Sequence, residues 1–186
     1  MREWVPVSSS AKGRLALRAL EEFGRRGFAE VGVAELAEQA GVTTGSLYHH
    51  FGSKLGLYAV ARAEAERRLL DRMEGAAAAR AAEGPAAVLR AALLVGFDFV
   101  VAQDFARLLG EAHPDREPLE DPVARMAAEL LDGGRTPIAR MIAAAWREAL
   151  ATLADGVPAA LARAGLAVLS VDEAPGLSPP RSSRTP

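Results

Sequence analysis

Apolar residues recur along most of the chain at intervals of three to five positions, with arginine, glutamate and alanine between them. In residues 10–26, for example, Leu15, Ala19 and Phe23 stand four positions apart. Residues at this spacing lie on one face of an α-helix, because successive turns place them one above the other. The segment is therefore predicted to be an amphipathic helix that ends at Gly27.

The same periodicity predicts helices over most of the remaining sequence, with glycine and proline at the breaks. They are expected at about residues 33–40, 43–51, 54–79, 85–101, 105–112, 123–131, 137–153 and 158–169. No segment alternates apolar and polar residues over the length of a strand, and no internal repeat is visible. The predicted fold class is all-α.

A domain boundary is expected inside the long helix at 54–79 rather than at a linker. At 1.5 Å per residue this helix would be about 39 Å long, which is enough to join two domains. We place the amino-terminal domain at residues 1–58 and a second helical domain at residues 59–173. Residues 174–186 contain too few apolar side chains to pack and are predicted to be a disordered tail.

Composition narrows the class of protein. Half the residues are apolar and a quarter are charged, which indicates a globular protein in aqueous surroundings. No run approaches the ~20 apolar residues of a membrane span, and the amino terminus lacks the apolar core of a signal peptide. We therefore expect a cytoplasmic protein without a membrane partner. The absence of cysteine excludes disulfides, thiolate metal sites and thiol-based redox sensing.

Two short predicted helices separated by a glycine turn have the layout of a helix-turn-helix, with AELAEQA in the first and TTGSLYHHF in the second. In this motif the second helix enters the major groove of DNA, and its early residues reach base edges and phosphates. The early residues here are small: Thr43, Thr44, Gly45 and Ser46. They allow the backbone to approach closely, and the positive end of the helix favours a phosphate.

Helical spacing divides the second helix of the motif into two faces. Leu47 and Phe51 are apolar and four positions apart, so they are predicted to face the core. Tyr48, His49 and His50 spread over the opposite, exposed arc. A phenol and two imidazoles can donate hydrogen bonds to phosphate oxygens or to base edges. A surface helix with incidental histidines is the alternative interpretation of the same pattern.

Scarce side chains gather in residues 43–54. The net charge of −2 does not by itself suggest a nucleic-acid-binding protein. However, two of the three histidines and Lys54, one of only two lysines, lie in this stretch, and no acidic residue does. Local charge is therefore more informative here than global charge. A metal site at the two histidines is not predicted, because adjacent helical residues point about 100° apart and no third ligand is nearby.

Residues 10–60 resemble, in order and without gaps, the DNA-binding region of the TetR family of bacterial repressors. The resemblance rests on three motifs: F-x-x-x-G-F, then E-L-A-x-x-A-G-V, then G-x-L-Y-x-H-F-x-S-K-x-x-L. It implies that DNA is contacted by Thr43, Thr44, Gly45, Ser46, Tyr48, His49, His50 and Lys54. Of these, the better candidates for base edges are Thr44, Ser46 and His49, and those for phosphates are Tyr48, His50 and Lys54.

One edge of this region departs from the family pattern. Family members often carry serine, threonine or arginine near the start of the second helix of the domain. The corresponding residues here are Gly32, Val33 and Ala34. Any contact at this edge must therefore come from backbone N–H groups, and residues 43–54 have to carry most of the recognition.

The resemblance also implies the architecture of the chain: an amino-terminal three-helix helix-turn-helix DNA-binding domain, followed by a helical ligand-binding and dimerisation domain. Two copies would form a homodimer through a four-helix bundle of the last two helices. The small-residue faces of these helices contain Met141, Ala145, Ala149, Ala160 and Ala164. Packing within one chain is the alternative for these faces. In the dimer, the two recognition helices would lie about 34–36 Å apart, which is one turn of DNA.

The implied function is a ligand-responsive transcriptional regulator, most simply a repressor that a small-molecule effector releases from its operator DNA, although nothing in the residues separates a repressor from an activator. Candidates for the effector pocket are Phe97, Phe105, His113, Met126 and Trp146, each of which could instead be a core or surface residue. The rival interpretation is a helical ligand-binding protein or an enzyme that uses the helix-turn-helix as scaffold. Against an enzyme, no catalytic serine, histidine and acid set, metal triad or phosphate loop appears at meaningful spacing. No cofactor is expected.

Overall fold

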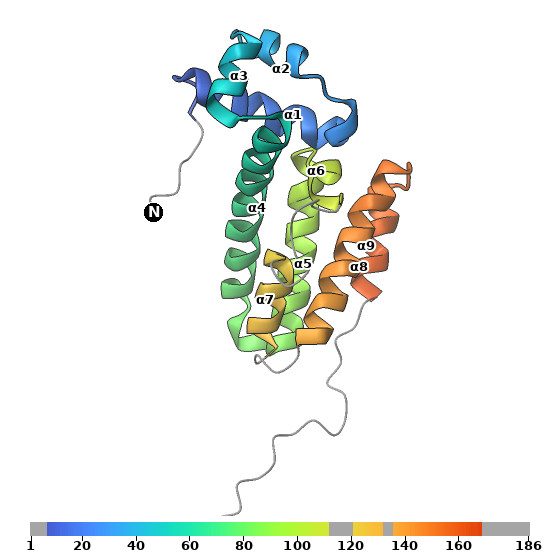
Figure 1. Ribbon diagram of the computed structural model, residues 1–186. Coiled ribbons are helices and arrows are strands. Elements are labelled where there is room, and N and C mark those ends of the chain that lie inside the picture. The colour runs from blue at the N-terminus through green and yellow to red at the C-terminus, as the bar shows by residue number, and fades with distance from the viewer. Residues whose placement is uncertain (1–6, 112–120, 132–135, 169–186) are drawn as a thin grey trace, which may run out of the picture.

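The computed structural model describes residues 7–111, 121–131 and 136–168, and these ranges contain helices and turns but no strand (Figure 1). The elements are α1 Ala11–Glu30, α2 Val33–Gln39, α3 Thr44–Phe51, α4 Lys54–Ala79, the 3-10 helix η1 Ala81–Glu83, α5 Pro85–Ala102, α6 Ala106–Gly110, α7 Pro122–Leu130, α8 Thr136–Ala154 and α9 Ala159–Val168. The predicted all-α fold class is confirmed. The tail predicted at residues 174–186 lies outside the described residues.

Helices α1, α2 and α3 form a head at one end of the molecule (Figure 1). Their apolar faces meet in a core whose central side chains are fully buried: Leu15, Phe23, Leu36 and Leu47. Burial of these large apolar side chains is the main driving force for folding of the head. Helix α1 begins after Ser10, whose hydroxyl accepts a hydrogen bond from the Gly13 N–H at 2.9 Å.

Helices α4 to α9 form an elongated bundle below the head (Figure 1). Helix α5 packs along α4, and α8 packs against α6, α7 and α9. Trp146 of α8 is fully buried, and its indole N–H donates to the carbonyl of Leu93 in α5 at 2.9 Å. Because this bond satisfies the polar atom of a large aromatic side chain, Trp146 can fix α8 against α5 without an orphaned donor.

Helix α4 connects the head to the bundle without a linker. It begins at Lys54 beside α3 and runs to Ala79 at the far end of the bundle (Figure 1). Its start is capped by Ser53, whose hydroxyl accepts from the Gly56 N–H at 2.9 Å. The helix is continuous across the boundary predicted between residues 58 and 59, so head and bundle share one rigid element.

Gly27 breaks α1, but one more helical turn follows it. The residue adopts a φ of +76°, and the helix then resumes as far as Glu30. A Cβ atom at this position would lie 2.2 Å from the carboxylate oxygen Oε1 of Glu111. Glycine is therefore favoured by the left-handed backbone, and a larger residue would also push the carboxylate of Glu111 aside. The helix end predicted at Gly27 is thus a kink.

Helix α5 corrects the expectation that no segment has the length and apolarity of a membrane span. Its 18 residues have a mean hydropathy of 1.8, so by length and composition alone this helix could cross a membrane. In this fold α5 packs against α4, α7, α8 and α9, so neighbours cover several of its sides. Its buried residues are Val88, Leu89, Ala92, Leu93, Gly96, Phe97 and Val100. The central helix of a bundle is apolar for this reason.

Candidate nucleic-acid interface

The turn between α2 and α3 sets the angle between these helices. Gly41 adopts a left-handed φ of +64°, and the Val42 N–H donates to the Ala37 carbonyl at 2.9 Å. Helix α3 then begins after Thr43, whose hydroxyl accepts from the Ser46 N–H at 3.2 Å. A glycine end on the first helix and a threonine cap on the second produce the predicted helix-turn-helix.

Helix α3 has a packed face and an open face, as its spacing predicts. Leu47 is completely buried, and Phe51 packs against the core from the end of the helix. On the other side Tyr48 is 52% exposed, His49 is exposed and His50 is half-buried. The two imidazole rings lie edge to face, with their centroids 5.0 Å apart. Three side chains that can form hydrogen bonds are thus presented together.

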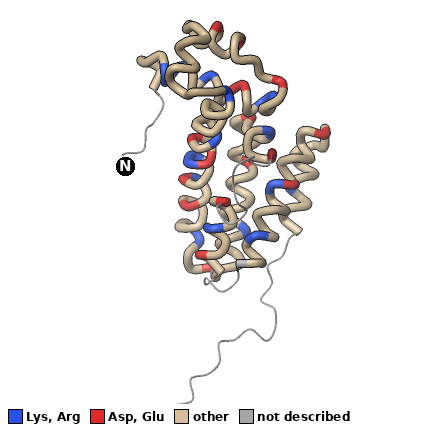
Figure 2. The backbone as a smooth tube through the Cα atoms, viewed as in Figure 1, with Lys and Arg blue, Asp and Glu red and all other residues tan. Residues whose placement is uncertain are grey.

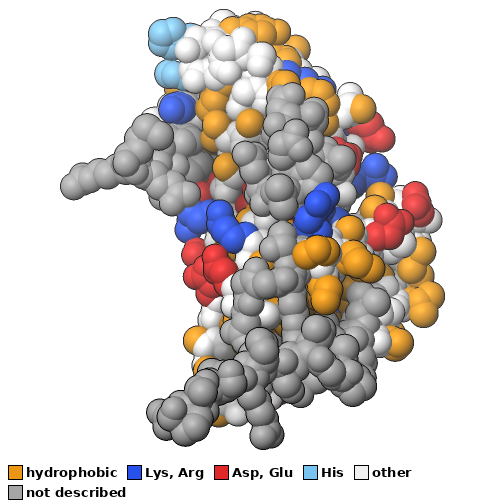
Figure 3. All heavy atoms as spheres, turned by 60° about the horizontal axis from the view of Figure 1, so that its bottom comes forward, with side chains coloured by type: hydrophobic (Ala, Val, Ile, Leu, Met, Phe, Trp, Pro, Cys, Tyr) orange, Lys and Arg blue, Asp and Glu red, His pale blue; other side chains and the backbone are white. Residues whose placement is uncertain are grey.

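The start of α3 is open to a partner. Thr43, Thr44 and Gly45 are exposed, and Ser46 is half-buried. Their small side chains leave the N–H groups of the first turn near the surface, where the positive end of the helix dipole favours an anion. Figure 3 shows the histidine side chains at one extremity of the molecule with a basic side chain beside them.

Lys54 makes a contact that its place in the sequence does not reveal. Its ammonium nitrogen lies 4.3 Å from the centroid of the Phe28 ring, and the side chain is half-buried. The resulting loss of water lowers the pKa of Lys54 below its ordinary value. A cation over an aromatic face is stabilised by about 0.5–2 kcal/mol. To bond a phosphate directly, Lys54 therefore has to leave this ring.

Lys12 is a candidate that the sequence analysis missed. It lies in the first turn of α1, and its ammonium nitrogen is 6.0 Å from the centroid of the Phe51 ring at the end of α3. Both lysines of the chain therefore lie close to the carboxyl-terminal end of α3. Because the chain has only two lysines, Lys12 could have been selected as a candidate on the same ground as Lys54.

Two arginines of α1 hold α2 in place. Arg14 donates to the Ala40 carbonyl at 3.0 Å, and Arg26 donates to the Glu35 carboxylate at 2.5 Å. The hydrogen bond and charge of Arg26 lower the pKa of Glu35 below its ordinary value. Figure 2 shows that α3 itself carries no acidic residue. A phosphate approaching α3 therefore meets no carboxylate on that helix.

The start of α2 lacks polar side chains that could contact DNA, as the sequence predicts. Gly32 caps the helix without a side-chain hydrogen bond, and both Gly32 and Ala34 are exposed. Val33 is half-buried and packs against the core. This edge therefore offers a partner its backbone N–H groups rather than polar side chains.

A polar junction joins the head to the bundle. The Phe28 N–H in α1 donates to the carboxylate of Glu111, which follows α6, at 3.3 Å. Arg62 of α4 donates to the Glu111 carbonyl at 2.7 Å and to the Tyr58 hydroxyl at 3.3 Å. The Tyr58 hydroxyl also donates to the Leu108 carbonyl at 3.4 Å. Because Arg62 is only 2% exposed, these contacts are shielded from water.

Further polar contacts extend the junction into α8. Arg62 Nε lies 3.2 Å from Glu66 Oε1, and Arg147 of α8 approaches the same oxygen at 3.8 Å. Arg147 also donates to the Asp121 carboxylate and to the Leu109 carbonyl. Together these contacts run from α7 and α8 through α4 to α1. We name this series the junction network: Phe28, Glu111, Arg62, Glu66, Arg147 and Asp121.

Asp121 is half-buried and accepts hydrogen bonds from three groups in this part of the structure. Burial alone would raise the pKa of Asp121, but the hydrogen bond and charge of Arg147 outweigh it. The N–H groups of Val123 and Ala124 donate to the same carboxylate at 2.8 and 3.2 Å, which lowers the pKa further. The pKa of Asp121 therefore lies below its ordinary value.

The stability of Asp121→Asn at different pH values tests whether the pKa of Asp121 is lowered in the folded chain. Because the pKa of Asp121 is lower in the folded chain, its carboxylate stabilises the fold above the unfolded value of about 4, and this contribution is lost as the pH falls through the folded value. The wild type should exceed Asp121→Asn in free energy of unfolding at pH 7, and the difference should shrink below about pH 4. Urea unfolding measures both. Asparagine keeps the helix cap, and Asp155→Asn, at an exposed turn, is the control. A difference that stays constant with pH would contradict the prediction.

The predicted effector-pocket residues lie mainly in the core of the bundle. Phe97, Phe105 and Trp146 belong to this core and are almost completely buried. Met126 is also buried, at the edge of a cleft of about 190 Å³ that residues of α4 and α7 line. His113 lies outside the described residues. A pocket formed by these residues stays a prediction.

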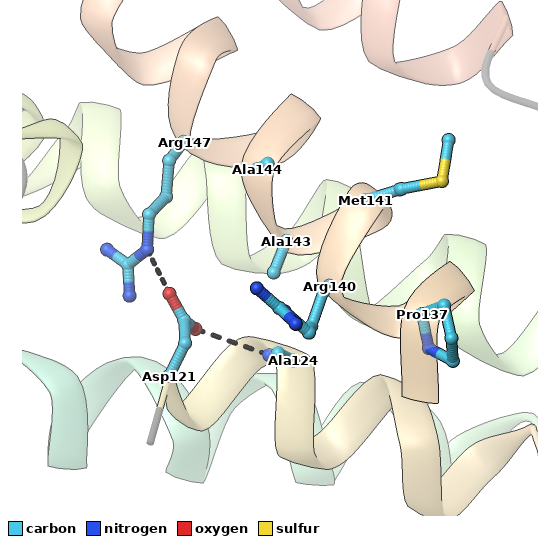
Figure 4. A pocket seen from close by; sticks show the side chains of 8 residues that line it. All are labelled: Asp121, Ala124, Pro137, Arg140, Met141, Ala143, Ala144 and Arg147. Carbon is cyan, nitrogen blue, oxygen red and sulfur yellow. Dashed lines mark hydrogen bonds and ion pairs between the residues drawn. The ribbon is translucent and has the colours of Figure 1, made fainter. Parts of the chain in front are cut away.

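A larger cleft opens between α7 and α8 (Figure 4). It has a volume of about 490 Å³ and is lined by Asp121, Ala124, Pro137, Arg140, Met141, Ala143, Ala144 and Arg147. Its two arginines could not be distinguished by their sequence, because an arginine on an amphipathic helix is usually solvated. The three consecutive alanines between them, Ala143 to Ala145, could have indicated a hollow beside this helix.

The amino-terminal part of the chain matches a known protein family. The family "Bacterial regulatory proteins, tetR family" matches residues 17–61, which run from α1 through α2 and α3 into α4. The match therefore includes the whole helix-turn-helix and residues 43–54, which are predicted to contact DNA.

Two curated relatives are similar to part of the chain. It is 50% identical over 48 residues to the HTH-type transcriptional regulatory protein RaaS of Mycobacterium tuberculosis, which covers 26% of this chain and 22% of the relative. It is 38% identical over 90 residues to the HTH-type transcriptional activator FasR of Mycolicibacterium smegmatis, which covers 48% of this chain and 40% of the relative. The chain thus matches less than half the length of these curated relatives.

Similarity to a solved structure extends over both parts of the molecule. A TetR-family transcriptional regulator from Pectobacterium atrosepticum superimposes with a TM-score of 0.58 at 25% sequence identity. The superposition covers 86% of this chain and 90% of that chain. The likeness therefore includes the helical bundle as well as the head.

Proposed function

Since the chain belongs to the TetR family of bacterial regulatory proteins, we propose that it regulates transcription by binding double-stranded operator DNA. The observation that carries this proposal is the open face of α3, on which Tyr48 and His49 stand opposite the buried Leu47. In a helix-turn-helix this helix enters the major groove, and its exposed side chains meet bases and phosphates. The protein acts in the cytoplasm, where bacterial DNA lies.

The residues on and around α3 divide into two roles. Base edges are contacted by Thr44, Ser46 and His49, and phosphates by Tyr48, His50 and Lys54, with Lys12 as a further phosphate contact. Phosphate contacts fix the position of the helix on the duplex, whereas base contacts supply sequence specificity. Thr43 and Gly45 contribute the cap and the close approach of the backbone.

Fluorescence anisotropy with labelled DNA from the region that flanks the gene tests the proposal. The wild type should bind this DNA at least about a thousandfold more tightly than an unrelated duplex of equal length at the same salt concentration. Replacing both Thr44 and His49 by alanine should remove most of this preference, because each good base contact contributes about 1–3 kcal/mol. Glu129→Ala, at an exposed position of α7, is the control. Equal affinity for both duplexes would contradict the proposal.

Lys54→Gln should weaken binding to both duplexes by a similar factor. A phosphate contact carries no sequence information, so the preference for the operator should remain. The slope of log affinity against log salt concentration should fall by about 1 per subunit, because one fewer counterion is released. Anisotropy titrations between about 50 and 200 mM salt measure this slope. An unchanged slope would remove Lys54 from the phosphate contacts and leave it with Phe28 alone.

A homodimer formed through α8 and α9 would bring two recognition helices to one operator. Several apolar side chains on these helices are exposed: Ile138, Met141, Leu161 and Val168. Met141 and Leu161 are 71% and 64% exposed, and Figure 3 shows hydrophobic side chains along this side of the molecule. A second copy related by a two-fold axis would bury them.

Sedimentation of a double variant tests the dimer. Met141→Glu together with Leu161→Glu should produce a monomer, because each glutamate would place a charge in the apolar centre of the interface. Val7→Glu changes an exposed apolar residue of the head, which is 50% exposed, and should leave the dimer intact. A wild type that sediments as a monomer at micromolar concentration would contradict the homodimer.

Ligand-responsive repression is the regulatory part of the proposal. Phe28 supports it, because its N–H is held by Glu111 while its ring carries the ammonium group of Lys54. A movement at the end of α6 would therefore be transmitted through Phe28 alone to Lys54, which we propose contacts DNA. A coupling of about 1–3 kcal/mol between effector and DNA sites would change operator affinity about 5- to 150-fold.

Activation is the second candidate, since the similar protein FasR is named an activator. A reporter placed behind the flanking DNA separates the two directions of regulation. Repression predicts that the protein lowers transcription of the reporter. A rise in transcription would instead support activation, with the same DNA contacts.

A further inference from the structure

The cleft between α7 and α8 combines apolar walls with two arginines. Its apolar lining residues are Ala124, Pro137, Ala143, Ala144 and Met141, of which Met141 also belongs to the face proposed for the dimer. Arg140 and Arg147 line it from positions two turns apart on α8, and Figure 4 shows Arg147 bonded to Asp121, which precedes α7. The volume of about 490 Å³ falls within the range of small-molecule sites.

The two arginines differ in their partners. Arg147 donates to the Asp121 carboxylate and to the Leu109 carbonyl. Arg140 is exposed, and no residue that the structure describes forms a hydrogen bond or ion pair with its guanidinium. The lining of the cleft therefore has two guanidinium groups and one carboxylate. Because Arg147 also approaches the carboxylate of Glu66, outside the lining, at 3.8 Å, the excess positive charge of the cleft lies on Arg140.

Another arginine-lined cleft, along α5, lacks this feature. Arg163 pairs there with Asp98 through two hydrogen bonds of 2.6 and 2.9 Å. Arg80 pairs with Glu83 at 2.9 Å. The third arginine of this lining, Arg90, is not free either. Because all three guanidinium groups already have partners, the cleft between α7 and α8 is the better site for an anion.

We propose that the cleft between α7 and α8 binds a small organic carboxylate with an apolar body. The carboxylate accepts hydrogen bonds from Arg140, whose planar group presents paired donors that match its two oxygens. The apolar body covers the alanine and proline side chains of the wall. A neutral molecule of the same shape lacks the charge to engage Arg140, and a cation meets two like charges.

The regulatory meaning of this site rests on the proposed function. A carboxylate at Arg140 also attracts Arg147, whose second bond holds the Leu109 carbonyl in α6. Helix α6 packs against α1, and Glu111 beyond it accepts the Phe28 N–H. Binding of a carboxylate in the cleft therefore weakens the contacts between the junction network and the head.

Calorimetric titration of the full chain tests the site. The probes are benzoate, hexanoate and octanoate, each compared with its uncharged amide. At least one carboxylate should bind about tenfold more tightly than its amide, which corresponds to one charge-assisted hydrogen bond. Arg140→Gln should remove that difference. Arg125→Gln, at an exposed position of α7 outside this cleft, should keep it. No preference for any carboxylate, or equal losses in both variants, would overturn the proposal.

Hydrogen exchange provides a readout that is independent of DNA. The carboxylate that binds most tightly should increase exchange at the Phe28 amide in the wild type but not in Arg140→Gln. Unchanged exchange at Phe28 would overturn the link from cleft to head. Operator binding measured on the same samples separates the two proposals, because failure to bind DNA would contradict the proposed function while leaving carboxylate preference intact.

Discussion

Arg62→Met should lower the free energy of unfolding by about 3 kcal/mol, the cost of breaking a buried ion pair. The side chain of Arg62 is 2% exposed, and its guanidinium lies 3.2 Å from the Glu66 carboxylate. It also donates to the Tyr58 hydroxyl and to the Glu111 carbonyl. Methionine occupies a similar volume but donates no hydrogen bond, so these acceptors lose a partner in a site shielded from water.

Urea unfolding followed by circular dichroism at pH 7 measures this loss. Arg68→Met is the matched control on the same helix, because Arg68 is 33% exposed and its partner Glu64 also pairs with Arg67. The control should lower the free energy of unfolding by less than about 1 kcal/mol. Similar losses in the two variants would show that the junction contributes no more than a surface ion pair.

Trp146→Ala should be at least as damaging, with a loss of about 3–5 kcal/mol in the free energy of unfolding. Trp146 is fully buried at the contact between α8 and α5, where its indole N–H donates to the Leu93 carbonyl. Alanine would leave a cavity and an unpaired carbonyl. The same urea experiment measures the change.

Trp146→Phe separates the two causes. Phenylalanine keeps much of the apolar volume but lacks the N–H, so it should cost less than alanine does. A loss below about 1 kcal/mol for Trp146→Ala would contradict the central place of this residue in the core.

The helices could be predicted because each has a local signal. Leu47 and Phe51 define the packed face of α3 by spacing alone, and Thr43 marks its start by its capping hydroxyl. The open face of the candidate site follows from the same spacing, since Tyr48 and His49 have to point the other way. These features require no knowledge of distant parts of the chain.

The junction network could not be predicted in this way. A charged residue on an amphipathic helix is normally solvated, and Arg62 is buried only because α6 packs beside α4 in the folded chain. Lys54 lies over Phe28, which follows the kink at Gly27 and packs against Tyr58 of α4, so the contact depends on two segments that are distant in the sequence. Similarly, a large aromatic residue such as Trp146 is expected in a pocket wall, but in the folded chain Trp146 packs against α5.

The continuity of α4 has a mechanical consequence. A helix of 26 residues behaves as a lever about 39 Å long, with its far end in the bundle and its near end beside α3. A tilt of about 5° at the far end would displace the near end by about 3.4 Å, which is the spacing of adjacent base pairs in DNA. A rearrangement too small to disturb the core of the bundle could therefore move each recognition helix out of register with its half-site.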